Sequence, residues 1–303
     1  MTKYVVKRVL LAIVTMFLIC LITFFAMNAI PGGPFNGEKA KSPAVMKVLN
    51  ERYNLDKPVI VQFGYYMKNL LHGDFGVSLK TGRDIRQTIN ESFVVSARIG
   101  AWAMLIAIVV GIVLGSIAAL LRNKWPDRVI VFFATLATAM PSFVLASLLL
   151  LLFCIKLKWI PVWNSTNHNY ILPVLSLSLY PMAYITRLTK TSMLDVLGQD
   201  YIRTARAKGV AAWKVIFKHG LRNALIPVIT YVGPMTASIL TGSLVIEKIF
   251  TIGGLGSKFV DCITNRDYTM IMGTTIFLAT LMVVMNLLSD LVYKLVDPRI
   301  KLE

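Results

Sequence analysis

The sequence has little charge and few acidic side chains. Charged residues make up 16% of its 303 residues, whereas hydrophobic residues make up 56%. Soluble domains are about 45–50% apolar even when glycine is counted, so this composition argues against an ordinary soluble domain. The 15 Asp and Glu are outnumbered by 32 Lys and Arg, which gives a net charge of +17. An apolar and basic chain indicates a membrane protein with cationic loops. No nucleic-acid partner is expected, because nucleic-acid-binding proteins usually carry their basic patch on a polar domain.

Motifs for catalysis and for metal binding are also absent. Cys20, Cys154 and Cys262 are far apart and form no CxxC, so we expect small buried hydrophobic side chains and no disulfide framework or metal site. The sequence contains no GxxxxGK[ST], HExxH or GxSxG, which excludes a phosphate-binding loop of its own. The three histidines are isolated, and no buried acidic pair suits a proton relay. We therefore expect no catalytic residue, no bound metal and no cofactor on this chain.

Long apolar runs are what the sequence does contain. About 20 apolar residues cross a bilayer core. On that template six spans are predicted, at 9–30, 94–121, 129–155, 170–186, 224–246 and 268–292. The first run is longer than the core of a signal peptide, and no A-x-A cleavage site follows it, so we interpret it as a retained span. The fold class expected is therefore an all-α polytopic membrane protein.

The distribution of Lys and Arg predicts that both termini lie inside. With that orientation the inner segments carry 17 Lys and Arg in 63 residues, against 14 in 98 outer residues, as the positive-inside rule requires. We predict four parts along the chain: an N-terminal membrane helix at 1–30, an external segment with short helices at 31–93, a transmembrane core at 94–293 and a cytoplasmic tail at 294–303. The core includes a cytoplasmic coupling loop at 187–223. Asp290 is the one acid inside a predicted span, at its cytoplasmic end, where we expect it to cap contacts or face water.

The external segment is too polar to span a membrane. Val45–Tyr53 and Val59–Leu71 are predicted as amphipathic helices. The second contains an apolar stripe made of Tyr65, Tyr66, Met67, Leu70 and Leu71. We expect this stripe to pack on the mouth of the helix bundle, and the alternative is contact with an external partner.

Small residues and prolines interrupt the predicted spans. Gly111 and Gly115 lie four residues apart, a spacing that allows close approach of two helices. Pro141 interrupts the third span, and Gly233-Pro234 falls in the middle of the fifth. Freed backbone groups of this kind are tolerated where neighbouring helices or a cavity satisfy them. Kinked helices around a path are typical of a transporter, but they also fit ordinary packing.

The most basic stretch of the chain is the loop Tyr201–Arg222. It has six Lys and Arg and no acid, which places it on the cytoplasmic side. Ala205, Ala207 and Gly209 give it small side chains over one helical turn, so another surface could approach the backbone closely. We predict a short helix near Tyr201–Lys208 that Gly209 ends as a C-cap, and a second helix over Ala211–His219.

This loop resembles a known family signature. YIRTARAKGV at 201–210 and HGLRNALIPV at 219–228 are similar to the cytoplasmic signature loop of ABC-importer permeases, in the oligopeptide/dipeptide branch. Gly209 matches the glycine of the general importer pattern, and Ala205 matches its second alanine. Arg203 stands at the glutamate position, a departure from the general pattern that is usual in the peptide branch. Thr204, His219 and Arg222, at the first alanine, isoleucine and proline positions, depart from it as well, whereas Leu221 stands at its leucine position.

Other stretches support the same resemblance. They are NLDKPVIVQFGYYMKNLLHGDFGVSL at 54–79, MPSFVLA at 140–146, the segment 242–273 and DPRIKL at 297–302. The resemblance covers the chain essentially end to end and is closest to the first of the two oligopeptide permease subunits. One departure is Gly253-Gly254, where a Pro-Gly pair is usual.

The resemblance implies a type I ABC-importer permease fold in a bacterial cytoplasmic membrane. It implies a second homologous permease subunit, two ABC ATPase subunits that use ATP and Mg, an extracellular peptide-binding protein, a peptide substrate and membrane lipid around the spans. The residues it implies for coupling to the ATPases are Tyr201, Arg203, Thr204, Ala205, Arg206, Ala207, Lys208 and Gly209. The candidates for lining the pathway are Pro141, Thr230, Gly233, Met235 and Ser238.

Several alternatives stay open at this point. The same architecture could import dipeptides or nickel complexes, although the 14 Met are scattered and no His lies in a predicted span, which favours peptides. A stand-alone channel or a membrane enzyme is a third class. For the basic loop, the alternative role is an anchor on anionic lipid, with each cation contributing about 1 kcal/mol.

Overall fold

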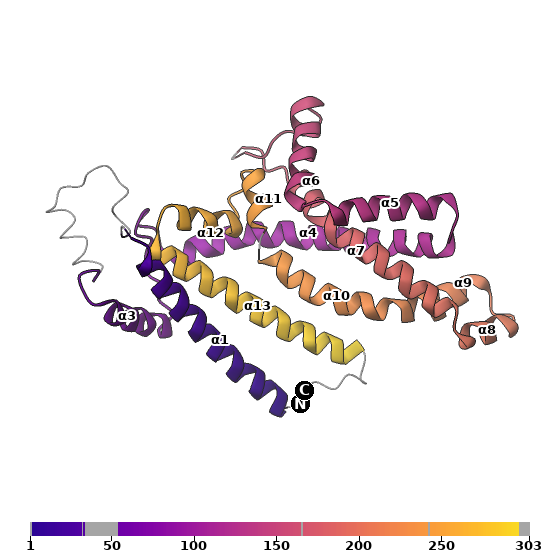
Figure 1. Cartoon of the computed structure of the whole chain (residues 1–303), viewed down its shortest axis with the longest axis horizontal. Coiled ribbons are helices and arrows are strands. Elements are labelled where there is room, and N and C mark those ends of the chain that lie inside the picture. Colours follow the sequence, from indigo (N-terminus) through magenta and orange to yellow (C-terminus); the bar gives the residue numbers. More distant parts are fainter. Residues whose placement is uncertain (1, 32, 34–53, 165, 242, 297–303) are drawn as a thin grey trace. The chain divides into compact units, whose positions relative to one another are not determined.

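A computed structural model describes residues 2–31, 33, 54–164, 166–241 and 243–296, and throughout these ranges the regular structure is helical (Figure 1). The predicted helix at 45–53 and the DPRIKL segment at 297–302 lie outside the described residues. The chain divides into two compact units, 1–95 with 253–283 and 96–252 with 284–303. The two units are described separately below.

The first unit is built on an apolar cluster between helices. It contains α1 (Thr2–Ala29), α3 (Val59–Leu71), the start of α4 (Ile85–Leu120), α12 (Leu255–Thr264) and the first part of α13 (Tyr268–Val296). Phe24, Phe63, Ile85, Leu255 and Met272 are buried together in its core.

The apolar stripe of α3 divides between this core and the surface. Tyr66, Met67 and Leu70 pack against the buried cluster, so the packing interpretation is confirmed for them. Tyr65 is 47% exposed and Leu71 is 82% exposed, so these two side chains stay available to another surface.

A buried carboxylate ties the external segment to the start of α13. Asp267 is 4% exposed and accepts hydrogen bonds from Ser78 Oγ and from the backbone N–H of Leu79 at 3.1 Å. The same side chain accepts from Met270 N at 3.3 Å and so caps the first turn of α13. One acid thus satisfies donors from two segments that are far apart in the sequence.

The second unit holds the remaining helices around a different cluster. They are the rest of α4, α5 (Trp125–Ala139), α6 (Ser142–Leu149), the π-helix η1 (Leu150–Lys156), α7 (Ile171–Leu197), α8 (Asp200–Ala207), α9 (Ala212–Lys214), the π-helix η2 (Val215–Leu221), α10 (Arg222–Leu240), α11 (Leu244–Ile249) and the last part of α13. Ala107, Ile185 and Val228 are buried together where α4, α7 and α10 meet.

The glycine pair of α4 allows this close packing, as predicted. A Cβ on Gly115 would lie 2.5 Å from the carbonyl oxygen of Thr186, and one on Gly111 would lie 2.8 Å from Ile185 Cγ2. Real Cβ atoms essentially never come that close to a neighbour, so no larger residue fits between α4 and α7 here.

Five described helices are long and apolar enough to cross a membrane, or six if the bent pair α5 and α6–η1 is one span. The third predicted span, at 129–155, corresponds to this bent pair, and the interruption expected at Pro141 is a break at which the two halves meet at 108°. The break is at Met140 and Pro141. Met140 has an extended backbone (φ −86°, ψ 137°), and Pro141 precedes α6 as its N-cap. Proline has no N–H to donate and disfavours helical conformation in the residue before it.

Other predicted boundaries need correction as well. The second span begins at Ile85, nine residues before the predicted start, and α7 continues to Leu197, eleven residues beyond the predicted end. In the fifth span, α10 ends at Leu240 and α11 begins at Leu244, and both lie within one candidate span, Ala212–Ile249, that contains the predicted 224–246. Hydropathy locates the apolar part of a helix. Helices α4 and α7 continue beyond their apolar parts through polar residues, whose backbone groups continue the helical hydrogen bonds.

Candidate functional site: the loop between α7 and α10

The basic loop is mostly helical. α7 ends at Leu197, α8 covers Asp200–Ala207, and α9 with η2 then leads into α10 without a break. The short helix predicted at 201–208 is present, one residue earlier than expected. The second predicted helix at 211–219 is instead one turn of α-helix followed by a π-helix that ends at Leu221. Residues 187–197 of the predicted cytoplasmic range 187–223 belong to α7, so that range contains the end of a long helix as well as the loop.

Gly209 ends α8 because of its backbone conformation. Its φ is +75°, a left-handed value that costs about 1–2 kcal/mol for a residue with a side chain. Gly209 N donates to Arg206 O at 3.0 Å, and Val210 N donates to Ala205 O at 3.2 Å. These bonds satisfy carbonyls at the end of α8. A Cβ at Gly209 would meet nothing within 4 Å, so the position demands glycine for its φ and leaves open space above the backbone.

One apolar residue fixes α8 to the rest of the unit. Ile202 has no exposed surface, although its helix is otherwise polar. Ala205 is half-buried, and the remaining predicted coupling residues are exposed: Tyr201, Arg203, Thr204, Arg206, Ala207, Lys208 and Gly209. The structure thus brings the predicted set together on one short helix with its outer surface uncovered. Sequence reasoning missed Ile202, for which the signal was a single isoleucine within a polar segment.

The base of the loop is packed and hydrogen-bonded. Met193 of α7, Ala119 of α4 and Ala224 of α10 are buried together, with Leu197 and Leu221 packed against them. Asn223 Nδ2 donates to Tyr201 Oη at 2.9 Å and to His219 O at 3.3 Å, which links the start of α8 to the start of α10. The Tyr201–Asn223 bond therefore ties α8 to the start of α10, whose first turn packs against the ends of α4 and α7.

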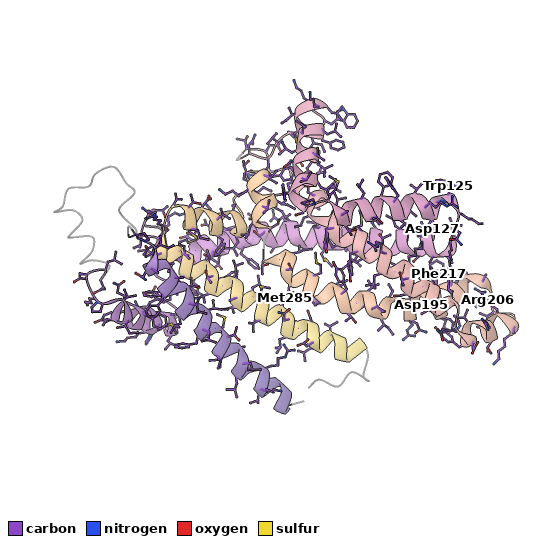
Figure 2. The ribbon with its side chains drawn as sticks, in the orientation of Figure 1. Trp125, Asp127, Asp195, Arg206, Phe217 and Met285 are labelled. Carbon is purple, nitrogen blue, oxygen red and sulfur yellow. The ribbon has the colours of Figure 1, made fainter. Side chains whose placement is uncertain are left out.

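Exposed aromatic side chains accompany the cations of the loop. Trp213 is 61% exposed and Phe217 is 58% exposed, and Figure 2 labels Phe217 and Arg206 near the end of the unit that carries α8. Lys214 Nζ lies 5.5 Å from the centre of the Trp213 ring, a cation–π contact. The loop thus offers cations and large rings together, a combination that charge counting did not predict.

A pocket of about 650 Å³ lies in the same unit, beside the bend at Pro141. Pro141, Met235 and Ser238 of the predicted pathway residues line it, whereas Thr230 and Gly233 are not among its lining residues. The pocket is lined by the end of α5 and by parts of α6, α7, α10 and α11. Ser176 Oγ, on α7, is buried and has no hydrogen-bond partner among the described residues. Among the residues described, no three His, Cys, Asp or Glu side chains come together in a way that could hold a metal ion.

Two family descriptions match this chain. "Binding-protein-dependent transport system inner membrane component" matches residues 111–302, and the N-terminal part of such membrane components matches residues 1–99. The dipeptide transport system permease protein DppB of Bacillus subtilis (strain 168) is 48% identical over 100% of this chain and 99% of its own. The oligopeptide transport system permease protein OppB of Salmonella typhimurium is 42% identical over 99% of this chain and all of its own.

Two solved structures share the fold. A chain of the MetNI methionine ABC transporter aligns with a TM-score of 0.55 at 14% identity, over 70% of this chain and 97% of that one. A chain of an amino acid ABC transporter aligns with a TM-score of 0.53 at 15% identity, over 71% of this chain and 95% of that one. At these identities the likeness concerns the fold.

Proposed function

The chain belongs to the family of binding-protein-dependent transport system inner membrane components, and we propose that it forms half of the passage through which an ABC importer takes up short peptides. In this family it is a non-catalytic membrane subunit, so the chemistry of ATP hydrolysis belongs to other chains. Relatives named for oligopeptide and for dipeptide transport both align along the full chain, which supports peptides as the substrate class.

The proposed partners follow from what the loop offers. α8 is too short and too exposed to be a stable unit by itself, yet Ile202 and Asn223 hold it firmly at its base. A rigidly held helix with a free cationic surface fits insertion into a cleft on an ATPase subunit. The complete importer would contain a second homologous permease, two ATPases that use ATP and Mg, and an external binding protein that delivers the peptide.

The observation that carries the proposal is the hydrogen bond between Tyr201 of α8 and Asn223 of α10, together with the burial of Ile202. Closure of the two ATPases on ATP would displace α8. Because Tyr201 of α8 is hydrogen-bonded to the first turn of α10, and that turn packs against the ends of α4 and α7, those helices would tilt with it. Coupling of this kind needs rigid elements with two discrete arrangements. The passage between the two permeases would then change the side to which it is open.

The pocket beside Pro141 is the proposed part of the passage that this chain supplies. Its lining mixes apolar side chains with the hydroxyls of Ser142, Tyr180 and Ser238. Peptides of varied sequence share a backbone that donates and accepts hydrogen bonds, and hydroxyl groups do both. Such a lining gives passage without strong selection, which leaves selection to the external binding protein.

The proposal is tested by gentle detergent purification followed by reconstitution. We expect two ATPases and a second permease to co-purify with the chain, and the assembled complex to take up peptide only with ATP and the binding protein. Conductance by the chain alone would support a channel instead, and uptake of nickel complexes without peptide uptake would overturn the substrate class.

A further inference from the structure

A buried ion pair joins α5 to α7. Lys190 Nζ lies 2.5 Å from Asp127 Oδ1, the Asp127 side chain is 6% exposed, and the Lys190 side chain is 21% exposed. The second carboxylate oxygen of Asp127 accepts from Asn123 N at 2.9 Å, so both oxygens have partners. Asp127 lies in the first turn of α5, where the helix dipole favours a negative charge. Figure 2 shows Asp127 next to Trp125, at the start of α5.

The position of the pair on α7 relates it to the loop. Lys190 lies near the end of α7, close in sequence to Met193, which is buried in the cluster where the ends of α4, α7 and α10 meet. A displacement of α8 that tilts α7 therefore moves Lys190. Through the ion pair, the start of α5 would move with it.

The packing between α5 and α7 is interrupted along part of their length. An apolar cavity of about 340 Å³ lies between them, lined by residues that include Phe133 and Ala134 of α5 and Met182 and Ala183 of α7. Side chains beside a void lose contacts on one side, so van der Waals attraction between the two helices is reduced there. The ion pair is nearly shielded from water, where the attraction between charges is stronger than at the surface.

Both helices also reach the pocket beside Pro141. Thr138 and Ala139, at the end of α5, line it, and so do Ser176 and Tyr180 of α7. The bend at Pro141 directly follows α5. A movement of α5 is therefore a movement of the pocket wall.

We propose that Asp127 and Lys190 are positioning residues that make α5 follow α7, so that displacement of α8 reaches the bend at Pro141. This inference rests on the proposed function, because it assigns the pair a part in coupling ATP hydrolysis to peptide movement. Breaking the pair removes the polar link between the two helices, so α5 follows α7 less closely. ATP is then hydrolysed without a matching change at the pocket.

The test uses the complete reconstituted importer with its binding protein, and measures peptide uptake and ATP hydrolysis in the same vesicles. Lys190→Met and Asp127→Asn are each expected to lower the peptide taken up per ATP hydrolysed by about tenfold, within the range seen for residues along coupling networks. The exchanged pair Asp127→Lys with Lys190→Asp restores the attraction between the two side chains but loses the bond from Asn123 N and places a positive charge in the first turn of α5, so it is expected to recover part of this ratio. Arg83→Met is the matched control, because it removes an ion pair to Glu91 that is exposed to solvent.

The ratio of peptide taken up to ATP hydrolysed distinguishes a defect in coupling from a defect in folding. If the pair merely stabilised the chain, the single variants would assemble in smaller amounts but would couple as well per complex as the unaltered protein, and that result would overturn the inference. A charge exchange that assembles normally yet stays uncoupled would also overturn it. Failure of the proposed function looks different, because the unaltered complex would then take up no peptide at all.

Discussion

Gly209 and Ile202 act on α8 in different ways. Ile202 fixes the helix by burial, whereas Gly209 ends it by adopting a left-handed φ of +75° with no neighbour above it. The resemblance to a family signature pointed to Gly209. No pattern pointed to Ile202, because its role depends on the surface that α8 meets after folding.

Gly209→Ala is expected to weaken uptake severalfold while the chain still inserts. The added side chain makes the left-handed φ cost about 1–2 kcal/mol, so the turn after α8 is formed less often. Gly64→Ala in α3 is the matched control, because it also has open space around it and lies inside a helix, where alanine is favoured over glycine by about 1 kcal/mol. Peptide uptake by vesicles with equal amounts of each protein checks this. Equal uptake by Gly209→Ala and the unaltered protein would contradict it.

Asp267→Ala is expected to lower the unfolding temperature of the purified protein. The change leaves the buried donors of Ser78, Leu79 and Met270 without their acceptor, at a cost of about 2–3 kcal/mol. Glu91→Gln removes an exposed ion pair and is the control, with an expected cost below about 1 kcal/mol. A thermal unfolding scan in detergent compares them, and equal unfolding temperatures would show that the capped turn contributes nothing.

Cys262 is expected to resist alkylation in the folded protein. Burial raises the pKa of its thiol from the usual 9.0 to about 12, so at pH 8 it holds even less of the reactive thiolate than an ordinary cysteine. Maleimide labelling between pH 7 and pH 9, followed by mass spectrometry of the labelled peptides, measures this. We expect modification of Cys262 only after denaturation. Rapid labelling of the native protein would show that α12 is more open than described.

At the scale of the helices, Gly111 and Gly115 explain the close approach of α4 to α7. Their approach was predictable from the spacing of Gly111 and Gly115, since small residues four apart mark a helix face that admits a neighbour. The partner helix was not predictable, because spacing on one helix carries no information about which surface meets it. The 108° break after α5 also escaped prediction, since a proline within an apolar run fits either a kink or a full break.

Gly115→Ala is expected to disrupt the packing of α7 on α4. The new Cβ would lie 2.5 Å from a backbone oxygen, which cannot rotate away, so overpacking of about 1–3 kcal/mol follows. Because α7 leads into α8, uptake should fall together with the unfolding temperature. Val113→Leu, on an exposed part of the same helix, is the control. An unchanged unfolding temperature for Gly115→Ala would mean that the two helices can separate at little cost.

For the chain as a whole, sequence reasoning identified the class of protein better than its internal geometry. Composition and Lys and Arg placement predicted a membrane protein with a basic inner loop, and the loop's resemblance identified the family. The compact units could not be predicted, because each joins segments distant in sequence, such as Ser78 with Asp267. The Asp127–Lys190 ion pair could not be predicted for the same reason, since its two residues are 63 positions apart in the sequence.

The central claim is that the exposed surface of α8 contacts an ATPase subunit, and site-specific photo-cross-linking tests it most directly. A photoreactive amino acid is placed at Ala207 in the assembled importer, and at Leu71 of α3, also exposed, as the control. Irradiation is predicted to give an adduct between the Ala207 variant and an ATPase, and none from the Leu71 variant. An ATPase adduct from Leu71 and none from Ala207 would contradict the account.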